Sequence, residues 1–158
     1  MTIAQFTVPP VVKAVWVRAA PARAFECFAL DLARWWPLAQ FHTGPDPVDC
    51  AIEPRAGGRV FERSADGRET AWGTVRAYDP PHRLAFSWIV GLSVEQEQLV
   101  EIRFIAEDLG TRVELTHSGW EKLGDAAASR RAGYDRGWGT VFEQHFADYA
   151  NAATEVRQ

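Results

Sequence analysis

The sequence predicts an α+β fold in which a curved antiparallel β-sheet wraps around a long C-terminal α-helix. Two observations carry this prediction. Between residues 50 and 118, short segments that alternate apolar and polar side chains are separated by corners rich in Gly, Pro and Asp, the pattern of an antiparallel meander. The last quarter of the chain has apolar side chains at the three- and four-residue spacing of an amphipathic helix, which is large enough to cover the dry face of that sheet.

The first elements precede the meander. Residues 11–17 form an apolar run rich in β-branched side chains that follows two prolines, and we expect a first strand there. Pro21 occupies a position typical of a helix start, and Pro37 ends the segment that follows it. Between them, apolar side chains recur at helical spacing and predict one amphipathic helix or two short ones: Phe25, Phe28, Leu32 and Trp35. Residues 38–47 should form a loop.

The strands of the meander are expected at residues 50–53, 59–63, 70–78, 84–90, 98–106 and 111–118. Alternation is clearest in the later strands. Leu84, Phe86 and Trp88 share one face of their strand, and Leu115 and His117 share one face of theirs. Many of the intervening positions hold charged residues, so the sheet should have one wet face and one dry face.

The terminal helix is expected over residues 128–152, with a buried stripe built largely from aromatic side chains: Tyr134, Trp138, Val141, Phe142, His145 and Tyr149. Trp138 is surrounded by Gly133, Gly137 and Gly139; each glycine costs about 1 kcal/mol relative to alanine inside a helix, so helix stability does not select them. Glycine leaves room beside a large ring. We therefore expect this part of the helix to form one wall of an internal cavity; a helix kinked to pack over a curved sheet is the alternative.

Composition places further bounds on function. A length of 158 residues suits one domain, which we expect to span 1–158 with a core at about 11–153. The formal net charge of −4 and the scattered basic residues speak against nucleic acid as a partner. Residues 1–8 lack the features of a signal peptide, and no apolar run is long enough to span a membrane. Cys27 and Cys50 are therefore expected to be reduced, buried thiols of a cytoplasmic protein.

Several short motifs occur in an order and spacing that resemble a known family. They are Ala20-Pro21 with Phe25, Trp35-Trp36, Glu53-Pro54-Arg55-Ala56-Gly57-Gly58-Arg59, Trp72-Gly73, Pro80-Pro81-His82-Arg83-Leu84, His117-Ser118-Gly119-Trp120 and Gly137-Trp138. The pattern covers nearly the whole chain and resembles the START-like (SRPBCC) superfamily. Within it, the pattern is similar to the branch of homologues of the activator of the ninety-kilodalton heat-shock protein ATPase. This resemblance implies a helix-grip (START-like, Bet v 1-like) fold with a deep apolar cavity between the sheet and the terminal helix.

The side chains expected to face that cavity are mostly aromatic. By their phase we assign to the ligand-binding surface Trp88, Phe86, Phe104, His117, Tyr134, Trp138, Phe142 and His145. His117 and His145 are also the candidates for a catalytic general base, because histidine transfers protons near neutral pH; each could instead bond a backbone carbonyl. The histidine and cysteine spacings match no metal site, and no glycine-rich loop opens a helix, so we expect neither a metal nor another cofactor.

Three functions fit these features. The first is binding of a small hydrophobic ligand, either a lipid or an aromatic, polyketide-like molecule, in the internal cavity. The second is a cavity enzyme of the cyclase, dehydratase or hydrolase type that uses a histidine base, by analogy with related folds. The third is a co-chaperone that stimulates a heat-shock protein ATPase, although the chain offers no additional domain for such an interface. Ligand binding is our main prediction, with a small hydrophobic molecule as the partner, and a homodimer is left open.

Overall fold

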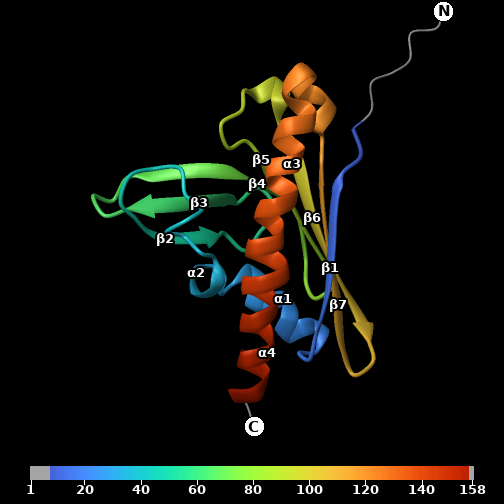
Figure 1. Ribbon diagram of the computed structural model, residues 1–158. Coiled ribbons are helices and arrows are strands. Elements are labelled where there is room, and N and C mark those ends of the chain that lie inside the picture. Colours follow the sequence, from blue (N-terminus) through green and yellow to red (C-terminus); the bar gives the residue numbers. More distant parts are fainter. Residues whose placement is uncertain (1–7, 157–158) are drawn as a thin grey trace, which may run out of the picture.

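The predicted α+β helix-grip fold is confirmed. The computed structural model describes residues 8–156 and shows a curled seven-stranded antiparallel sheet that packs against a long C-terminal helix (Figure 1). The expectation about a signal peptide falls almost entirely on residues outside this described part. The strands lie in the order β1-β7-β6-β5-β4-β3-β2, with bounds Val11–Val17 (β1), Pro47–Ile52 (β2), Arg59–Ser64 (β3), Glu69–Asp79 (β4), Arg83–Trp88 (β5), Gln98–Glu107 (β6) and Gly110–Ser118 (β7).

Helices occupy the two predicted regions, with bounds Pro21–Ala29 (α1), Leu32–Trp35 (α2), Ala127–Trp138 (α3), Gly139–Phe146 (η3) and Ala147–Val156 (α4). Two 3₁₀ segments lie at Val94–Gln96 (η1) and Trp120–Ala126 (η2). The first region is therefore two short helices rather than one. Pro21 begins α1, where its missing N–H would have no helical partner in any case. The last three segments, α3, η3 and α4, follow one another without a break and form the long terminal helix.

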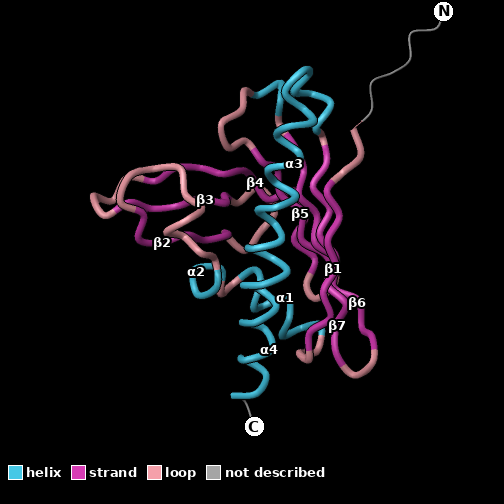
Figure 2. Tube along the Cα trace, in the orientation of Figure 1, coloured by secondary structure: helices cyan, strands magenta, loops and turns pink. Residues whose placement is uncertain are grey.

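Strand β4 bends the sheet. Its first part pairs with β3 and its second part pairs with β5. The register shifts near Trp72 in the first pairing and near Arg76 in the second, and such bulges bend a strand. Next to the first bulge, Gly73 lies so close to β5 that a Cβ there would be 1.7 Å from the carbonyl oxygen of Ser87, which explains the glycine. The two halves of the sheet consequently run in clearly different directions (Figure 2).

The terminal helix changes its pitch in the middle. The η3 segment is π-helical, so its turns close through i→i+5 hydrogen bonds and hold more residues than α-turns. The buried face therefore shifts along the sequence. Phe146 and Ala150 are fully buried, whereas His145 and Tyr149, which regular α-helical spacing places in the stripe, are only half-buried. The predicted stripe is correct up to Phe142 and one residue out of phase beyond it.

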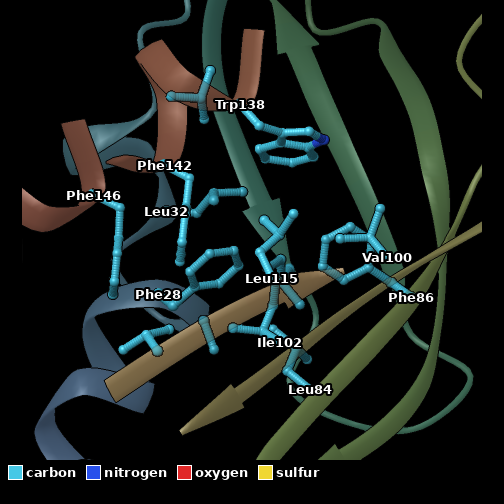
Figure 3. Close-up of a cluster of buried hydrophobic side chains, with 14 of the residues drawn as sticks. Phe28, Leu32, Leu84, Phe86, Val100, Ile102, Leu115, Trp138, Phe142 and Phe146 are labelled. Carbon is cyan, nitrogen blue, oxygen red and sulfur yellow. The ribbon is translucent and has the colours of Figure 1, made fainter. Parts of the chain in front are cut away.

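A packed core fills the space beneath η3. Figure 3 shows Phe142 and Phe146 extending from the terminal helix toward Phe28, with Leu115 and Ile102 of the sheet close by. The rings of Phe142 and Phe146 stack in parallel with centroids 5.4 Å apart, and the Phe28 ring meets Phe146 edge-on at 5.3 Å. All five side chains are buried. A cavity between helix and sheet must therefore lie toward α3.

Two further predictions concern membrane-spanning segments and the state of the cysteines. Within residues 8–156, no helix combines the length and the apolar character needed to cross a bilayer. Cys27 and Cys50 both lie buried as thiols. Burial, together with the nearby carboxylates of Asp49 and Glu62, raises the pKa of the Cys50 thiol to about 12, so this sulfur stays protonated and unreactive.

Candidate functional site

A cavity of about 320 Å³ opens between α3, the loop that follows α2, and the bent strands β4 and β5. Small-molecule sites span about 300 to 1,000 Å³, so this one is compact. Its floor is formed by buried residues: Trp72, Trp88, Trp138 and Val141. Its sides are formed by half-buried residues: Trp36, Phe41, Val90, Tyr134 and Gly137. Its rim is formed by exposed residues: Gln40, His42, Thr43, Ser129, Arg130 and Gly133.

Two of the three glycines around Trp138 form part of the cavity wall. Gly133 and Gly137 lie one helical turn apart on α3, and both line the cavity. A Cβ at Gly133 would meet no atom within 4 Å, and a Cβ at Gly137 would lie 3.5 Å from Phe41 Cε1. The glycines therefore leave open space rather than permit a close backbone contact. Gly139 lies outside the lining.

Replacing Gly133 by alanine should stabilise the protein. We expect Gly133→Ala to raise the free energy of unfolding by about 0.5 to 1 kcal/mol, because alanine loses less conformational entropy in a helix and no atom stands in its way. Urea denaturation measures the change. Gly57→Ala is the matched control: the space there is equally open, but the φ of +85° makes alanine strained and destabilising. A lower urea midpoint for Gly133→Ala than for the wild-type protein would contradict the conclusion that the cavity wall is open at this position.

A buried carboxylate fixes residues 36–44, the rim loop, to the sheet. Glu62 on β3 is 0% exposed. Its Oε1 accepts hydrogen bonds from Thr43 N–H (2.6 Å), Thr43 Oγ1–H (2.8 Å) and Trp72 Nε1–H (2.8 Å), and its Oε2 accepts one from Gly44 N–H (2.9 Å). Burial by itself raises the pKa of this carboxyl, but the hydrogen bonds outweigh it and lower the pKa. Glu62 is thus ionised at neutral pH and holds both the rim loop and a floor residue.

His117 lies behind the floor rather than in the cavity. It is 0% exposed. Its Nδ1 accepts a hydrogen bond from Trp138 Nε1–H at 3.0 Å, so Nε2 carries the ring proton and donates to Gln98 Oε1 at 2.6 Å. Burial lowers the pKa of this imidazole to about 3, which keeps it neutral near pH 7. Both nitrogens are engaged, so His117 orients Trp138 and has no free position from which to accept a ligand proton.

The tryptophans of the cavity all use their indole N–H groups within the protein. The four donor–acceptor pairs are Trp36 with the Phe41 carbonyl oxygen, Trp72 with Glu62, Trp88 with the Tyr134 hydroxyl oxygen, and Trp138 with His117. These tryptophans therefore present only ring faces and edges to the cavity. Tyr134 accepts one of these bonds and keeps its own hydroxyl proton for another partner.

Three of the eight predicted ligand-binding residues line the cavity: Trp88, Tyr134 and Trp138. The other five lie outside its lining, with Phe86, Phe104 and Phe142 buried in the core, His117 buried behind the floor, and His145 half-buried on η3. The periodicity of the side chains could not separate the residues that line the cavity from those in the core, because the dry face of the sheet is longer than the cavity. The π-helical pitch of η3 accounts for the position of His145.

The rim loop is the part of the site that the sequence reasoning missed. Five of its residues line the cavity: Trp36, Gln40, Phe41, His42 and Thr43. The sequence predicts a helix end and a loop there, and only Trp36 belongs to one of the motifs. Trp72 also lines the cavity, although it is not among the eight predicted ligand-binding residues. One feature of the sequence could have indicated it: large aromatic side chains occur in a loop rich in Gly and Pro. Such side chains are usually buried, so their presence in a loop suggests that the loop packs against the rest of the protein.

Many of the other charged groups form surface ion pairs. Arg59 bonds both Glu53 and Glu69, and Arg63 also bonds Glu69. Exposed pairs of this kind contribute about 0 to 1 kcal/mol each, and they lie away from the cavity lining. Among residues 8–156, no group of three or more His, Cys, Asp or Glu side chains is placed to hold a metal ion.

Comparison with known protein families agrees with this architecture. The family described as Activator of Hsp90 ATPase homolog 1-like protein (AHSA1) matches residues 18–151, which include every element from α1 to η3 and the first half of α4. The chain belongs to this family. The resemblance inferred from the motifs is thereby confirmed. No curated protein matches this AHSA1-like chain.

Solved structures cover the AHSA1-like chain almost from end to end. An anthrahydroquino-γ-pyrone synthase, Txn09, in complex with SUM, is 33% identical over 90% of this chain and 97% of its own, with a TM-score of 0.61. A Rhodobacter sphaeroides protein is 19% identical and covers 99% of both chains, with a TM-score of 0.67. The Aha1 dimer from Colwellia psychrerythraea is 15% identical over 91% of this chain and 97% of its own, with a TM-score of 0.64. The last two likenesses show the fold alone.

Proposed function

We propose that the cavity binds a compact, planar aromatic molecule of the polyketide type. The observation that carries this proposal is the floor of tryptophan rings whose N–H groups are all engaged elsewhere. Aromatic rings attract one another through offset-stacked and edge-to-face contacts with centroids about 4.5 to 7 Å apart, so flat walls favour a flat ligand. The open wall at Gly133 and Gly137 supports the same conclusion, because a side chain there would occupy space beside the rings.

The comparison with Txn09 supports an aromatic ligand and adds a second candidate function, ring closure on that ligand. When a pyrone ring closes, a phenol oxygen adds to a carbonyl carbon and water leaves, so a proton must be removed and returned. The lining offers His42 and the Tyr134 hydroxyl for this transfer. Catalysis therefore depends on different residues from His117 and His145, the bases that the sequence pattern indicated.

Titration monitored by tryptophan fluorescence tests the binding proposal. Because four of the seven tryptophans line the cavity, 1,2-dimethoxyanthraquinone and flavone should each quench the fluorescence in a saturable way. Gly133→Phe should abolish the response by filling the wall, and Gly133→Ala should retain it. A thermal melt establishes that both variants are folded. The proposal fails if neither compound binds the wild-type protein, or if Gly133→Phe binds them equally well.

Ring closure is tested separately. The substrate is a hydroxyanthraquinone with a β-diketone side chain next to its phenol, and mass spectrometry follows the loss of one water. A rate above that in buffer, reduced in His42→Gln, would support the enzyme. A wild-type rate equal to that in buffer would remove ring closure and leave ligand binding in place.

The setting of this function is also a proposal. The buried thiols of Cys27 and Cys50 support a reducing compartment, and we place the protein in the cytoplasm. Ellman's reagent, applied to denatured protein from fresh lysate, counts the reactive thiols. Fewer than two reactive thiols per chain would contradict this proposal. The family description names an ATPase activator, and the ring-lined cavity favours a small-molecule ligand over that role in this chain.

A further inference from the structure

Among residues 8–156, free hydrogen-bonding capacity in the cavity is found at the Tyr134 hydroxyl, which keeps its own proton, and at a few groups of the rim. The indole N–H groups of the floor and sides are all engaged. Two rim donors are engaged as well, since Thr43 Oγ1–H donates to Glu62 and Ser129 Oγ–H donates to a backbone carbonyl oxygen three residues earlier. Within residues 8–156, the rim side chains whose N–H donors have no such partner are Gln40 and Arg130.

Within the part of the chain that the structure describes, Arg130 is the only Asp, Glu, Lys or Arg residue in the lining. Its side chain reaches the turn after β5, where a Cβ on Gly91 would lie 3.7 Å from Arg130 Nη2. The protein carries 21 acidic residues and a net charge of −4, yet no carboxylate of the described residues forms an ion pair with this guanidinium. A free guanidinium beside an apolar cavity favours an anionic ligand, because it donates charge-assisted, bidentate hydrogen bonds to oxygen anions.

His42 adds an acceptor to the same rim. Its Nδ1 lies 2.8 Å from the carbonyl oxygen of Gly44, which can only accept, so Nδ1 carries the ring proton. In the neutral imidazole, Nε2 is consequently an unprotonated acceptor. Gly44 is itself held to the sheet by Glu62, which fixes the imidazole through the rim loop. A rim that offers an imidazole acceptor and a free cation suits an ionisable hydroxyl group.

From this distribution we infer that the ligand is a fused-ring aromatic that carries an acidic oxygen group, a phenol hydroxyl or a carboxylate. Its rings lie against the tryptophan floor and its oxygen lies at the rim. There, Arg130 stabilises the anion, and His42 accepts the hydrogen bond of a hydroxyl that is still protonated. This inference rests on the proposed binding function and narrows its ligand class.

Alizarin (1,2-dihydroxyanthraquinone) and its dimethyl ether test the inference, because they share one ring system and only alizarin can ionise. Tryptophan quenching gives both affinities, and the visible spectrum reports the ionisation of bound alizarin. We expect alizarin to bind about tenfold more tightly than the ether and to ionise at a lower pH when bound. Arg130→Gln should remove that tenfold preference, because it should weaken the binding of alizarin much more than the binding of the ether. Arg136→Gln is the matched control, since Arg136 is exposed on the same helix outside the lining.

The outcomes separate the two proposals. If neither compound binds the wild-type protein, the binding function itself fails. If both compounds bind equally, or if Arg130→Gln keeps the preference for alizarin, the inference about the acidic group is overturned and the binding function stands. Equal loss of preference in Arg136→Gln would also overturn it, because a general effect of net charge would then suffice. Arg130 is exposed, so its replacement should leave the fold intact, and thermal melts verify this.

Discussion

Glu62→Ala should lower the free energy of unfolding by about 3 kcal/mol. The substitution removes the acceptor of four donors: two backbone N–H groups, a hydroxyl and an indole N–H. A buried donor without a partner costs about 1 to 3 kcal/mol, and hydration of the exposed rim loop recovers part of the sum. Guanidinium denaturation followed by far-UV circular dichroism measures the loss. Ligand affinity should fall as well, because the rim loop and Trp72 both lose their anchor.

Two further substitutions show whether the effect belongs to the buried carboxylate. Glu69→Ala removes a carboxylate from the exposed ion pairs with Arg59 and Arg63 and should cost less than about 1 kcal/mol. Glu62→Gln keeps one acceptor oxygen and brings an NH₂ group against a donor, so its cost should lie between the two. A loss in Glu62→Ala no greater than that in Glu69→Ala would show that the rim loop is held by other contacts.

Lowering the pH from 7 to 5 should cost the protein about 2 kcal/mol of stability through His117. The unfolded chain binds a proton to this histidine near pH 6.5, whereas burial lowers the pKa of the folded imidazole to about 3. Stability is therefore fully present above pH 6.5 and is lost as the pH falls from there toward 3. Glu62 and Glu101, whose pKa values are lowered from 4.5, act in the same direction only below that value. Urea denaturation at pH 5, 6 and 7 isolates the histidine.

The comparison with His117→Gln makes this prediction specific. Glutamine offers Trp138 an acceptor and Gln98 a donor but does not titrate, so the stability of the variant should change about 2 kcal/mol less over the same interval. His82→Gln, in an exposed turn, should keep the wild-type pH dependence. A wild-type pH dependence in His117→Gln would mean that another group causes the loss.

Most of the fold could be predicted because its signals are local. An apolar run rich in β-branched residues predicts β1 at its observed bounds, and alternation and turn residues predict the other strands within a few residues of theirs. The bend in β4 could not be predicted, since it depends on the distance between Gly73 and Ser87 of a neighbouring strand. The π-helical segment has no residue signature, and the buried face beyond Phe142 was consequently displaced by one position.

The residues of the candidate site could be predicted only where the periodicity of a strand or helix determines which way a side chain points. The positions of Trp88, Tyr134 and Trp138 follow from strand and helix periodicity, as does the inward direction of His117. The rim loop could not be predicted, because its conformation depends on hydrogen bonds to Glu62, which lies 18 and 19 residues further along the chain. Glu62 is also fully buried and its four hydrogen bonds come from uncharged donors, whereas the usual expectation for a glutamate in a strand is an exposed side chain.

The floor and the rim of the cavity differ in how far they can be altered. Each floor tryptophan also donates a hydrogen bond to another part of the protein. Changing Trp72 or Trp138 to suit a new ligand would therefore leave Glu62 or His117 without one of its hydrogen-bond partners. The side chains of Gln40 and Arg130 form no hydrogen bond or ion pair with another described residue. To redesign this protein for other compounds, the rim residues should therefore be varied first and the floor tryptophans kept. Ligand selectivity can then be changed without lowering the stability of the fold.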